Sequence, residues 1–194
     1  MALLPVRWWT DGAFAEAPAP ALTHVIGVRG QPDRATARRT IRAALVDALA
    51  QAGNLPAARI RLRGTPGEAP YALLGARRIS LSISHDGDLS VAAFRLDGGA
   101  VGIDLMQVAD IPDWQAVAHD YLGPACAAAL ARLPAPARAA AFARAWSERE
   151  ARLKCRGRQL AEWRSGDDAG LAACPCLALA VPDGYVGALA LPPA

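Results

Sequence analysis

Residues 79–106 read ISLSISHDGDLSVAAFRLDGGAVGIDLM and contain the clearest β-strand signal of the chain. Three short apolar segments, 79–84, 89–96 and 100–106, are joined by the turn sequences HDGD and DGG. Short apolar runs separated by Asp-Gly turns are typical of β-hairpins. The stretch therefore predicts an antiparallel meander in a single sheet. In that arrangement the HDGD turn and Asp104 lie near the same edge of the sheet.

The flanking sequence predicts helices on both sides of the meander. Pro32 precedes, and Gly53-Asn54 follows, a segment that we expect to be helical over about 33–52. A helical region is expected over about 113–133 and a long helix over about 137–156, capped by Gly157. The tail CLALAVPDGYVGALAL, residues 176–191, predicts a final hairpin. These elements together indicate an α+β fold.

The composition is typical of one compact globular unit. The chain has 194 residues, 53% of them hydrophobic, and a net charge of only +3, which excludes a disordered chain. Its mean hydropathy is +0.16, but the longest apolar stretch, 169–180, is too short to span a membrane and contains Pro175. The N-terminal MALLPVRWW lacks the features of a signal peptide. We expect a cytoplasmic protein with no membrane partner.

The cysteines do not predict a metal site. Cys174-Pro-Cys176 has no matching second pair, so the spacing of zinc ligands is not met. We expect buried, reduced thiols.

Arginines gather in the first half of the chain. One cluster lies within residues 29–42 and a second within 59–63. Such clusters suit phosphates or an acidic partner, whereas the simpler interpretation is a solvated helix face. A domain that binds nucleic acid is a further alternative. It would require aromatic side chains interleaved with the basic ones, and the tryptophans are not so placed, so we expect no nucleic-acid partner.

The helix over 137–156 contains WSEREARLK, residues 146–154, with the only lysine among 21 basic residues. At helical spacing Arg149 falls on the apolar stripe, and Glu150 and Lys154 border it. One interpretation is an ordinary i,i+4 surface ion pair between Glu150 and Lys154. Against it, arginine would serve such a pair equally well, whereas only lysine can give up a proton. Asp104 is a second acid on an apolar element, and two such acids suggest Mg²⁺ shared with substrate phosphates.

Together these residues resemble the 4′-phosphopantetheinyl transferase superfamily. The family pattern reads (V/I)-G-(V/I)-D, a long gap, then W-(S/T)-x-(K/R)-E-(A/S)-x-x-K, and here VGID (101–104) precedes WSEREARLK by such a gap. Upstream, SHDG (84–87) resembles the family's S-H-x-G turn, and RRT (38–40) resembles its basic helix segment. The resemblance covers about residues 35–160, and the motifs are specific only in combination.

The resemblance implies an enzyme that moves phosphopantetheine from coenzyme A to a serine of an apo acyl or peptidyl carrier protein. It implies Mg²⁺ bound by Asp104 and Glu150, with Glu150 also activating the serine and Lys154 neutralising the leaving phosphate. It further implies that His85 and Arg39 hold coenzyme A phosphates, assisted by Arg149. A catalytically degenerate protein that binds coenzyme A or a carrier remains an alternative.

The chain also departs from the family pattern. Many members carry a second acid where this chain has Met106, so we expect Asp86 of the S-H-x-G turn to be the third metal ligand. The G-K-P segment of many members has its nearest match in GEAP, residues 67–70, which lacks the basic residue. The length resembles the Sfp-type, which is monomeric and has two similar halves in one chain. That implies a pseudo-twofold fold divided into 1–98 and 99–194, with the active site between the halves.

Overall fold

Two β-sheets and five α-helices make up the part of the chain that the computed structural model describes, residues 3–64 and 69–193. The larger sheet has the strand order β3-β2-β4-β8-β7-β6-β5, and the smaller has the order β1-β10-β11-β9. The strands are β1 Leu4–Pro5, β2 Arg7–Thr10, β3 Ala13–Phe14, β4 Thr23–Val28, β5 Ile60–Arg63, β6 Tyr71–Leu74, β7 Arg77–Asp86, β8 Leu89–Arg95, β9 Gly102–Gln107, β10 Cys176–Ala180 and β11 Tyr185–Ala190.

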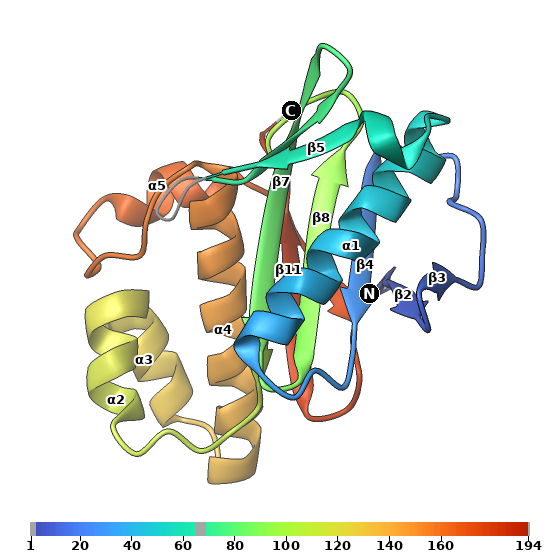
Figure 1. The fold of residues 1–194 in the computed structure, drawn as a ribbon. Helices are drawn as coiled ribbons and strands as arrows, with labels where there is room; N and C mark the ends of the chain where they lie inside the picture. The colour runs from blue at the N-terminus through green and yellow to red at the C-terminus, as the bar shows by residue number, and fades with distance from the viewer. Residues whose placement is uncertain (1–2, 65–68, 194) are drawn as a thin grey trace.

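The two sheets pack against each other between two long helices (Figure 1). Helix α1, Arg34–Gly53, covers the outer face of the larger sheet, where Ile41 and Leu45 pack against Phe94. Helix α4, Ala135–Cys155, covers β9 and β11 of the smaller sheet. The inner faces share a core that includes Val91 of β8 and Ile103 of β9. Burial of these apolar faces supplies most of the free energy that favours folding.

The predicted three-stranded meander is wrong in its third strand. Strands β7 and β8 form the expected antiparallel hairpin, but β9 pairs with β11 in the smaller sheet. The reason is that β8 already has a neighbour on each side, β4 and β7, so no edge of β8 is left for β9. The turn at 85–88 still lies near β9, because β9 packs beside β7 across the two sheets.

Side chains alternate between two environments along β9. Ile103 and Leu105 face the core between the sheets, whereas Met106 packs with the helices on the other side. Asp104 shares the outward face with Met106, since side chains alternate along a strand. This parity directs Asp104 toward α4.

The two long helices begin and end close to their predicted limits. Asp33 caps α1 through its side chain, and Asn54 ends the helix in the left-handed conformation. Helix α4 ends at Cys155, and Gly157 follows with φ +64°. Arg158 N donates to Leu153 O at 2.9 Å and Gly157 N to Lys154 O at 3.1 Å, which is the Schellman arrangement. The cap predicted for Gly157 is confirmed.

The helical region predicted over 113–133 is interrupted. It consists of α2 (Trp114–Val117), a π-helical turn (Ala118–Leu122) and α3 (Pro124–Ala131). Gly123, with φ +89°, separates α3 from the turn, and Pro124 begins α3. The short elements η1 (Ala57–Arg59) and α5 (Asp167–Ala172) were not predicted.

The predicted C-terminal hairpin is confirmed, because β10 and β11 pair antiparallel. The larger sheet comes entirely from residues before Leu96, and the smaller from β9, β10, β11 and the N-terminal β1. The fold is therefore mixed α+β with two sheets. The division at 98/99 and the twofold relation of the halves stay predictions.

Candidate active site

Helix α4 passes unusually close to β9 because one residue of that strand is a glycine. A Cβ atom on Gly102 would lie 1.9 Å from Ala151 O and 2.4 Å from Cys155 N, both backbone atoms of α4. Only glycine permits this approach. The contact brings the Lys154 turn of α4 beside Asp104, two residues along β9.

Asp104 and Lys154 form an ion pair at this crossing. Lys154 Nζ donates to Asp104 Oδ1 at 2.7 Å and to Ile103 O at 3.2 Å. Asp104 is only 6% exposed. Its Oδ1 also accepts from Ser84 Oγ of β7 at 2.8 Å, and that hydroxyl accepts from Leu105 N at 3.2 Å. A buried carboxylate needs such partners, and here β7 and α4 each supply one, while Leu105 N of β9 holds the Ser84 hydroxyl in place.

This ion pair decides between the two interpretations of Lys154. A surface pair with Glu150 would place the two side chains together on the solvent side of α4. Within the described residues, the ion pair of Lys154 is instead with Asp104, fifty positions away in sequence. The lysine therefore connects the helix to the strand.

Glu150 lies half-buried one turn before Lys154. Burial raises its pKa above the ordinary value, Asp104 raises it further, and Lys154 and then Arg149 oppose the shift. In the part of the chain that the structure describes, its carboxylate makes no hydrogen bond and no ion pair with another described side chain. A desolvated carboxylate beside a second acid attracts a proton or a cation.

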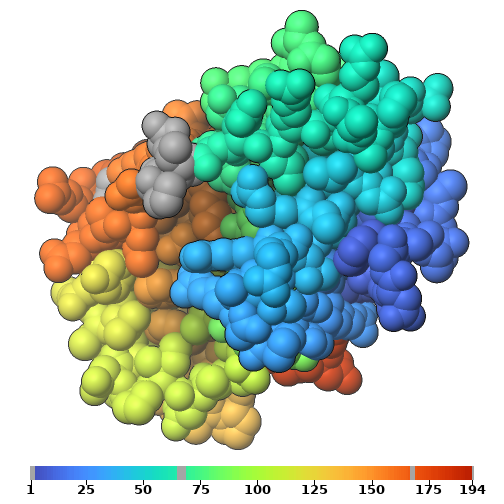
Figure 2. All heavy atoms as spheres, viewed as in Figure 1, coloured from blue at the N-terminus to red at the C-terminus, as the bar shows by residue number. Residues whose placement is uncertain are grey.

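The surface is hollowed between α1, in blue, and the yellow and orange helices α2, α3 and α4 (Figure 2). His85 of β7 is affected by positive charges on both α1 and α4. Burial lowers the pKa of His85 to about 4, with further lowering by Arg34 and Arg38 of α1 and by Lys154 of α4. His85 Nδ1 also lies 2.7 Å from Ser90 Oγ. A neutral histidine near three cations is an environment that favours binding of an anion.

Arg34 and Arg38 were not among the candidate residues. The structure brings them near His85, whereas Arg39 donates to Thr36 Oγ1 at 2.9 Å along its own helix. The i,i+4 spacing of Arg34 and Arg38 was the signal that could have found them. The first turn of α1 carries no acid. A positive charge at a helix N-terminus is unfavourable for helix stability because of the helix dipole, but it favours the binding of an anion there.

Three segments hold the turn that follows His85. Gln107 N at the end of β9 donates to Asp86 Oδ2 at 2.6 Å. Tyr185 OH of β11 donates to Asp88 Oδ1 at 3.0 Å, and Gln31 N donates to Asp88 O at 3.2 Å. The turn is thereby attached to both sheets and to the loop before α1. Asp88 had no predicted role.

The metal prediction rests on two acids. Among residues 3–64 and 69–193, no three His, Cys, Asp or Glu side chains gather closely enough to hold a metal ion. Asp86 uses one oxygen on Gln107 N, and Met106 packs in an apolar cluster. Gly67 and Glu68, from the expected GEAP segment, lie outside the described residues.

The structure does not bring Arg149 together with His85. Arg149 is 8% exposed and lines a cavity of about 450 Å³ with Glu148, Arg152 and Trp163. Arg152 pairs with Glu148 at 3.4 Å in this cavity. Arg149 acts on Glu150 electrostatically, one residue away on the helix.

We expect the environment of His85 to make folding stability depend on pH. Its folded pKa of about 4 lies below the ordinary 6.5, so the unfolded chain binds more protons between these values. The stability contributed by neutral His85 is therefore complete above pH 6.5 and is lost as the pH falls toward 4. Urea denaturation of a His85→Gln variant should show a smaller loss over this range. His119→Gln, at a side chain that is 66% exposed, should follow the wild type, and identical curves for all three proteins would contradict the expectation.

Residues 100–176 match the family model of the 4′-phosphopantetheinyl transferase superfamily. The matched segment contains β9 and α4, and so Asp104, Glu150 and Lys154. A search of curated proteins found no significant match. The described helices include none that is both long and apolar enough to cross a membrane. The family match supports the superfamily and, in general terms, a transferase that moves phosphopantetheine.

Proposed function

We propose, from this superfamily match and the meeting of Asp104, Glu150 and Lys154, that the chain transfers 4′-phosphopantetheine from coenzyme A to a serine of an apo acyl or peptidyl carrier protein. The bond from the serine oxygen to phosphorus forms, and the bond from phosphorus to the bridging pyrophosphate oxygen breaks. Adenosine 3′,5′-bisphosphate leaves. The observation that carries the proposal is the ion pair between Lys154 and Asp104, which fixes the WSEREARLK helix on the VGID strand.

The phosphates of coenzyme A are assigned to the cationic side of the hollow. Arg34 and Arg38 stand at the start of α1, and His85 faces them from β7. Binding a phosphate here relieves the repulsion that lowers the pKa of His85, so His85 gains a proton more easily when coenzyme A is bound. Arg39, on the same turn of α1, is a candidate for an outer phosphate.

Glu150 is assigned the proton of the serine hydroxyl. Its raised pKa makes it a better proton acceptor than an ordinary glutamate, and its carboxylate is not occupied by a described partner. Lys154 places one positive charge at the same point, where negative charge grows on the departing phosphate. Arg149, the preceding residue of the helix, lowers the pKa of Glu150 electrostatically.

The two acids also fit Mg²⁺. Burial is the main cause of the raised pKa of Glu150, and Asp104 raises that pKa further by electrostatic repulsion. Oxygen ligands of this kind are those that Mg²⁺ prefers. Bound there, Mg²⁺ would neutralise charge on the pyrophosphate. Asp86 is the candidate for a third oxygen, through the carboxylate oxygen that does not accept from Gln107 N.

The Sfp-type, monomeric state and cytoplasmic location belong to the same proposal. A single chain that carries two sheets, each covered by one long helix, supports the longer family type over the short trimeric one. The protein would have a role in secondary metabolism if its carrier belongs to a polyketide or non-ribosomal-peptide synthase.

The test is to incubate the protein with coenzyme A, Mg²⁺ and apo carriers of the fatty-acid, polyketide and non-ribosomal-peptide classes. We expect one carrier to gain the mass of phosphopantetheine and adenosine 3′,5′-bisphosphate to appear in equal amount. If coenzyme A binds but no carrier gains mass, the chain is the catalytically degenerate alternative. If coenzyme A does not bind either, the proposal is wrong.

A matched pair of variants tests why lysine is present at position 154. Lys154→Arg keeps a positive charge but cannot lose a proton and is too large for the contact with Asp104 and Ile103 O. We expect kcat to fall about 10- to 100-fold in Lys154→Arg and further in Lys154→Met. Full activity of Lys154→Arg in the carrier assay would show that any cation suffices there.

A further inference from the structure

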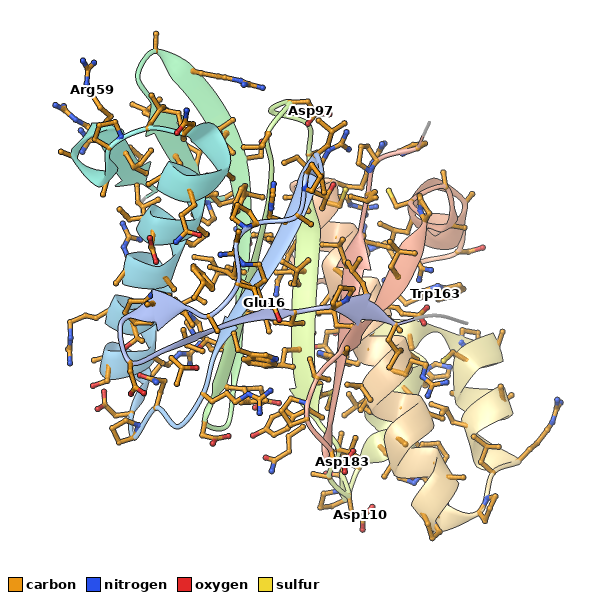
Figure 3. All side chains as sticks on the ribbon, turned by 90° about the vertical axis from the view of Figure 1, so that its right-hand side faces the viewer. Glu16, Arg59, Asp97, Asp110, Trp163 and Asp183 are labelled. Carbon is orange, nitrogen blue, oxygen red and sulfur yellow. The ribbon has the colours of Figure 1, made fainter. Side chains whose placement is uncertain are left out.

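A second cavity lies at the N-terminal edge of the larger sheet and shares no lining residue with the candidate active site. Its volume is about 490 Å³, within the range of pockets that hold small molecules. Strands β1, β2 and β4 form the inner wall, and residues 15–21 form the outer wall. Glu16 marks this outer segment where it crosses the face of the molecule (Figure 3).

Two polar side chains in this cavity have hydrogen-bonding atoms that no described residue satisfies. They are Nε and Nη1 of Arg7 and Nε2 of His24, and all three atoms are buried. His24 as a whole is only 7% exposed. Buried polar atoms are nearly always paired, because an unpaired one loses its hydrogen bonds to water without replacement. Three such unpaired atoms belong to side chains that line one cavity, and a bound ligand could pair with them.

Arg7 contributes a fixed cation. Its Nη2 donates to Gln51 Oε1 at 2.8 Å, and its guanidinium lies 4.0 Å from the centre of the Phe14 ring. These contacts hold the side chain in place while leaving Nε and Nη1 as donors. Asp47 and, to a smaller extent, Glu16 act on Arg7 electrostatically, but within the described residues neither forms an ion pair with it. The two free donors require an acceptor, and an anion suits a guanidinium best.

His24 contributes an acceptor. Its ring stacks on Phe94 with 4.8 Å between ring centres, and it hydrogen-bonds to the backbone of Ala21. Burial lowers its pKa, and the nearby Arg7 lowers it further, so the ring is neutral near pH 7. The nitrogen opposite to the bonded one, Nε2, then accepts. A ligand must offer it a hydrogen-bond donor.

Most of the rest of the lining is apolar, although Thr10, Glu16 and Thr23 also belong to it. Trp8, Phe14 and Val25 line the same space, so an apolar group of a ligand has aromatic and aliphatic carbon to pack against. A ligand that matches this cavity thus carries three groups in one small molecule: an anion for Arg7, a hydroxyl for His24 and an apolar group for the remaining wall.

We propose that this cavity binds a small hydroxy acid with an apolar body, whose carboxylate bonds to Arg7 and whose hydroxyl donates to Nε2 of His24. Because these polar atoms have almost no exposed surface, part of the cavity wall must shift to admit the ligand, and the segment 15–21 is the part of the wall that we expect to move. This segment is Ala- and Pro-rich, so few large side chains hold it against the sheet. The site is independent of the proposed transferase activity.

Mandelate is the probe, because it carries a carboxylate, a hydroxyl and a phenyl ring. Calorimetry on the ligand-free protein should show saturable binding at concentrations up to about 10 mM. Phenylacetate, which lacks the hydroxyl, should bind about 3- to 10-fold more weakly. Benzyl alcohol, which lacks the carboxylate, should show no saturable binding. Absence of saturable mandelate binding would overturn the proposal.

Two variants assign the contacts. Arg7→Met should weaken mandelate binding at least about tenfold, and because it removes a buried cation with unpaired donors it should not lower the Tm. His24→Phe keeps the stack on Phe94 and should abolish the preference for mandelate over phenylacetate, which is measurable even if Arg7→Met folds poorly. Arg59→Gln, far from Glu16 in Figure 3, should bind like the wild type. Equal binding by Arg7→Met and the wild type would mean an adventitious additive only, and would refute the site.

Discussion

Replacing Glu150 with glutamine should lower kcat/KM for carrier modification by about a thousandfold or more. The substitution preserves size and removes the carboxylate that we propose as the acceptor of the serine proton and as a ligand of the cation. Glu150 is desolvated and lies in the field of Asp104, as its raised pKa shows. The measurement is the rate at which the carrier gains mass at saturating coenzyme A.

The same variant should be at least as stable as the wild type. A raised folded pKa means that ionising Glu150 opposes folding, so stability falls as the pH rises above the ordinary value of 4.5. Glutamine removes that dependence. Lost activity with retained Tm therefore separates catalysis from folding.

Glu148→Gln is the matched control, because Glu148 is on the same helix but pairs with Arg152 in the other cavity. Its activity should stay within about threefold of the wild type. An active Glu150→Gln enzyme, or equal losses in both variants, would remove Glu150 from the proposed mechanism.

The largest loss of stability is expected for Gly102→Ala. The new methyl group would meet Ala151 O at 1.9 Å and Cys155 N at 2.4 Å, and neither backbone atom can turn aside as a side chain can. Helix α4 must then move away from β9. We expect a loss of about 3 kcal/mol or more in the free energy of unfolding, measured by urea denaturation. Activity should fall too, because the ion pair between Asp104 and Lys154 depends on the same approach.

Gly170→Ala is the control for this substitution. A Cβ atom there has no neighbour within 4 Å, and alanine favours a helix over glycine by up to about 1 kcal/mol. That variant should be neutral or slightly more stable. A Gly102→Ala protein that loses less than about 1 kcal/mol would show that α4 accommodates the methyl group without leaving β9.

Local patterns were sufficient for most elements. Asp33 and Asn54 mark the ends of α1, and Gly157 ends α4, because each signal acts on backbone groups within a few residues. The hairpins β7–β8 and β10–β11 follow from their turns for the same reason. The alternation along VGIDL also placed Asp104 on the opposite face from Ile103.

The partner of β9 could not be read in this way. Its pairing with β11 joins residues about eighty positions apart, and the choice depended on β8 having both edges occupied. The break at Gly123 was missed as well, although the pair Gly123-Pro124 is a local signal that ends one helix and begins the next.

By itself the sequence determined which groups are available for chemistry: an acid in VGIDL, an acid and the only lysine in WSEREARLK, and a histidine in a tight turn. Only the tertiary structure determined which of these groups lie in contact with one another. It gave Lys154 to Asp104 instead of Glu150 and placed Arg34 and Arg38, not Arg39, in the field of His85. The physical reason is range: helix and turn signals act over a few residues, whereas these contacts arise only when α1 and α4 pack on opposite sheets.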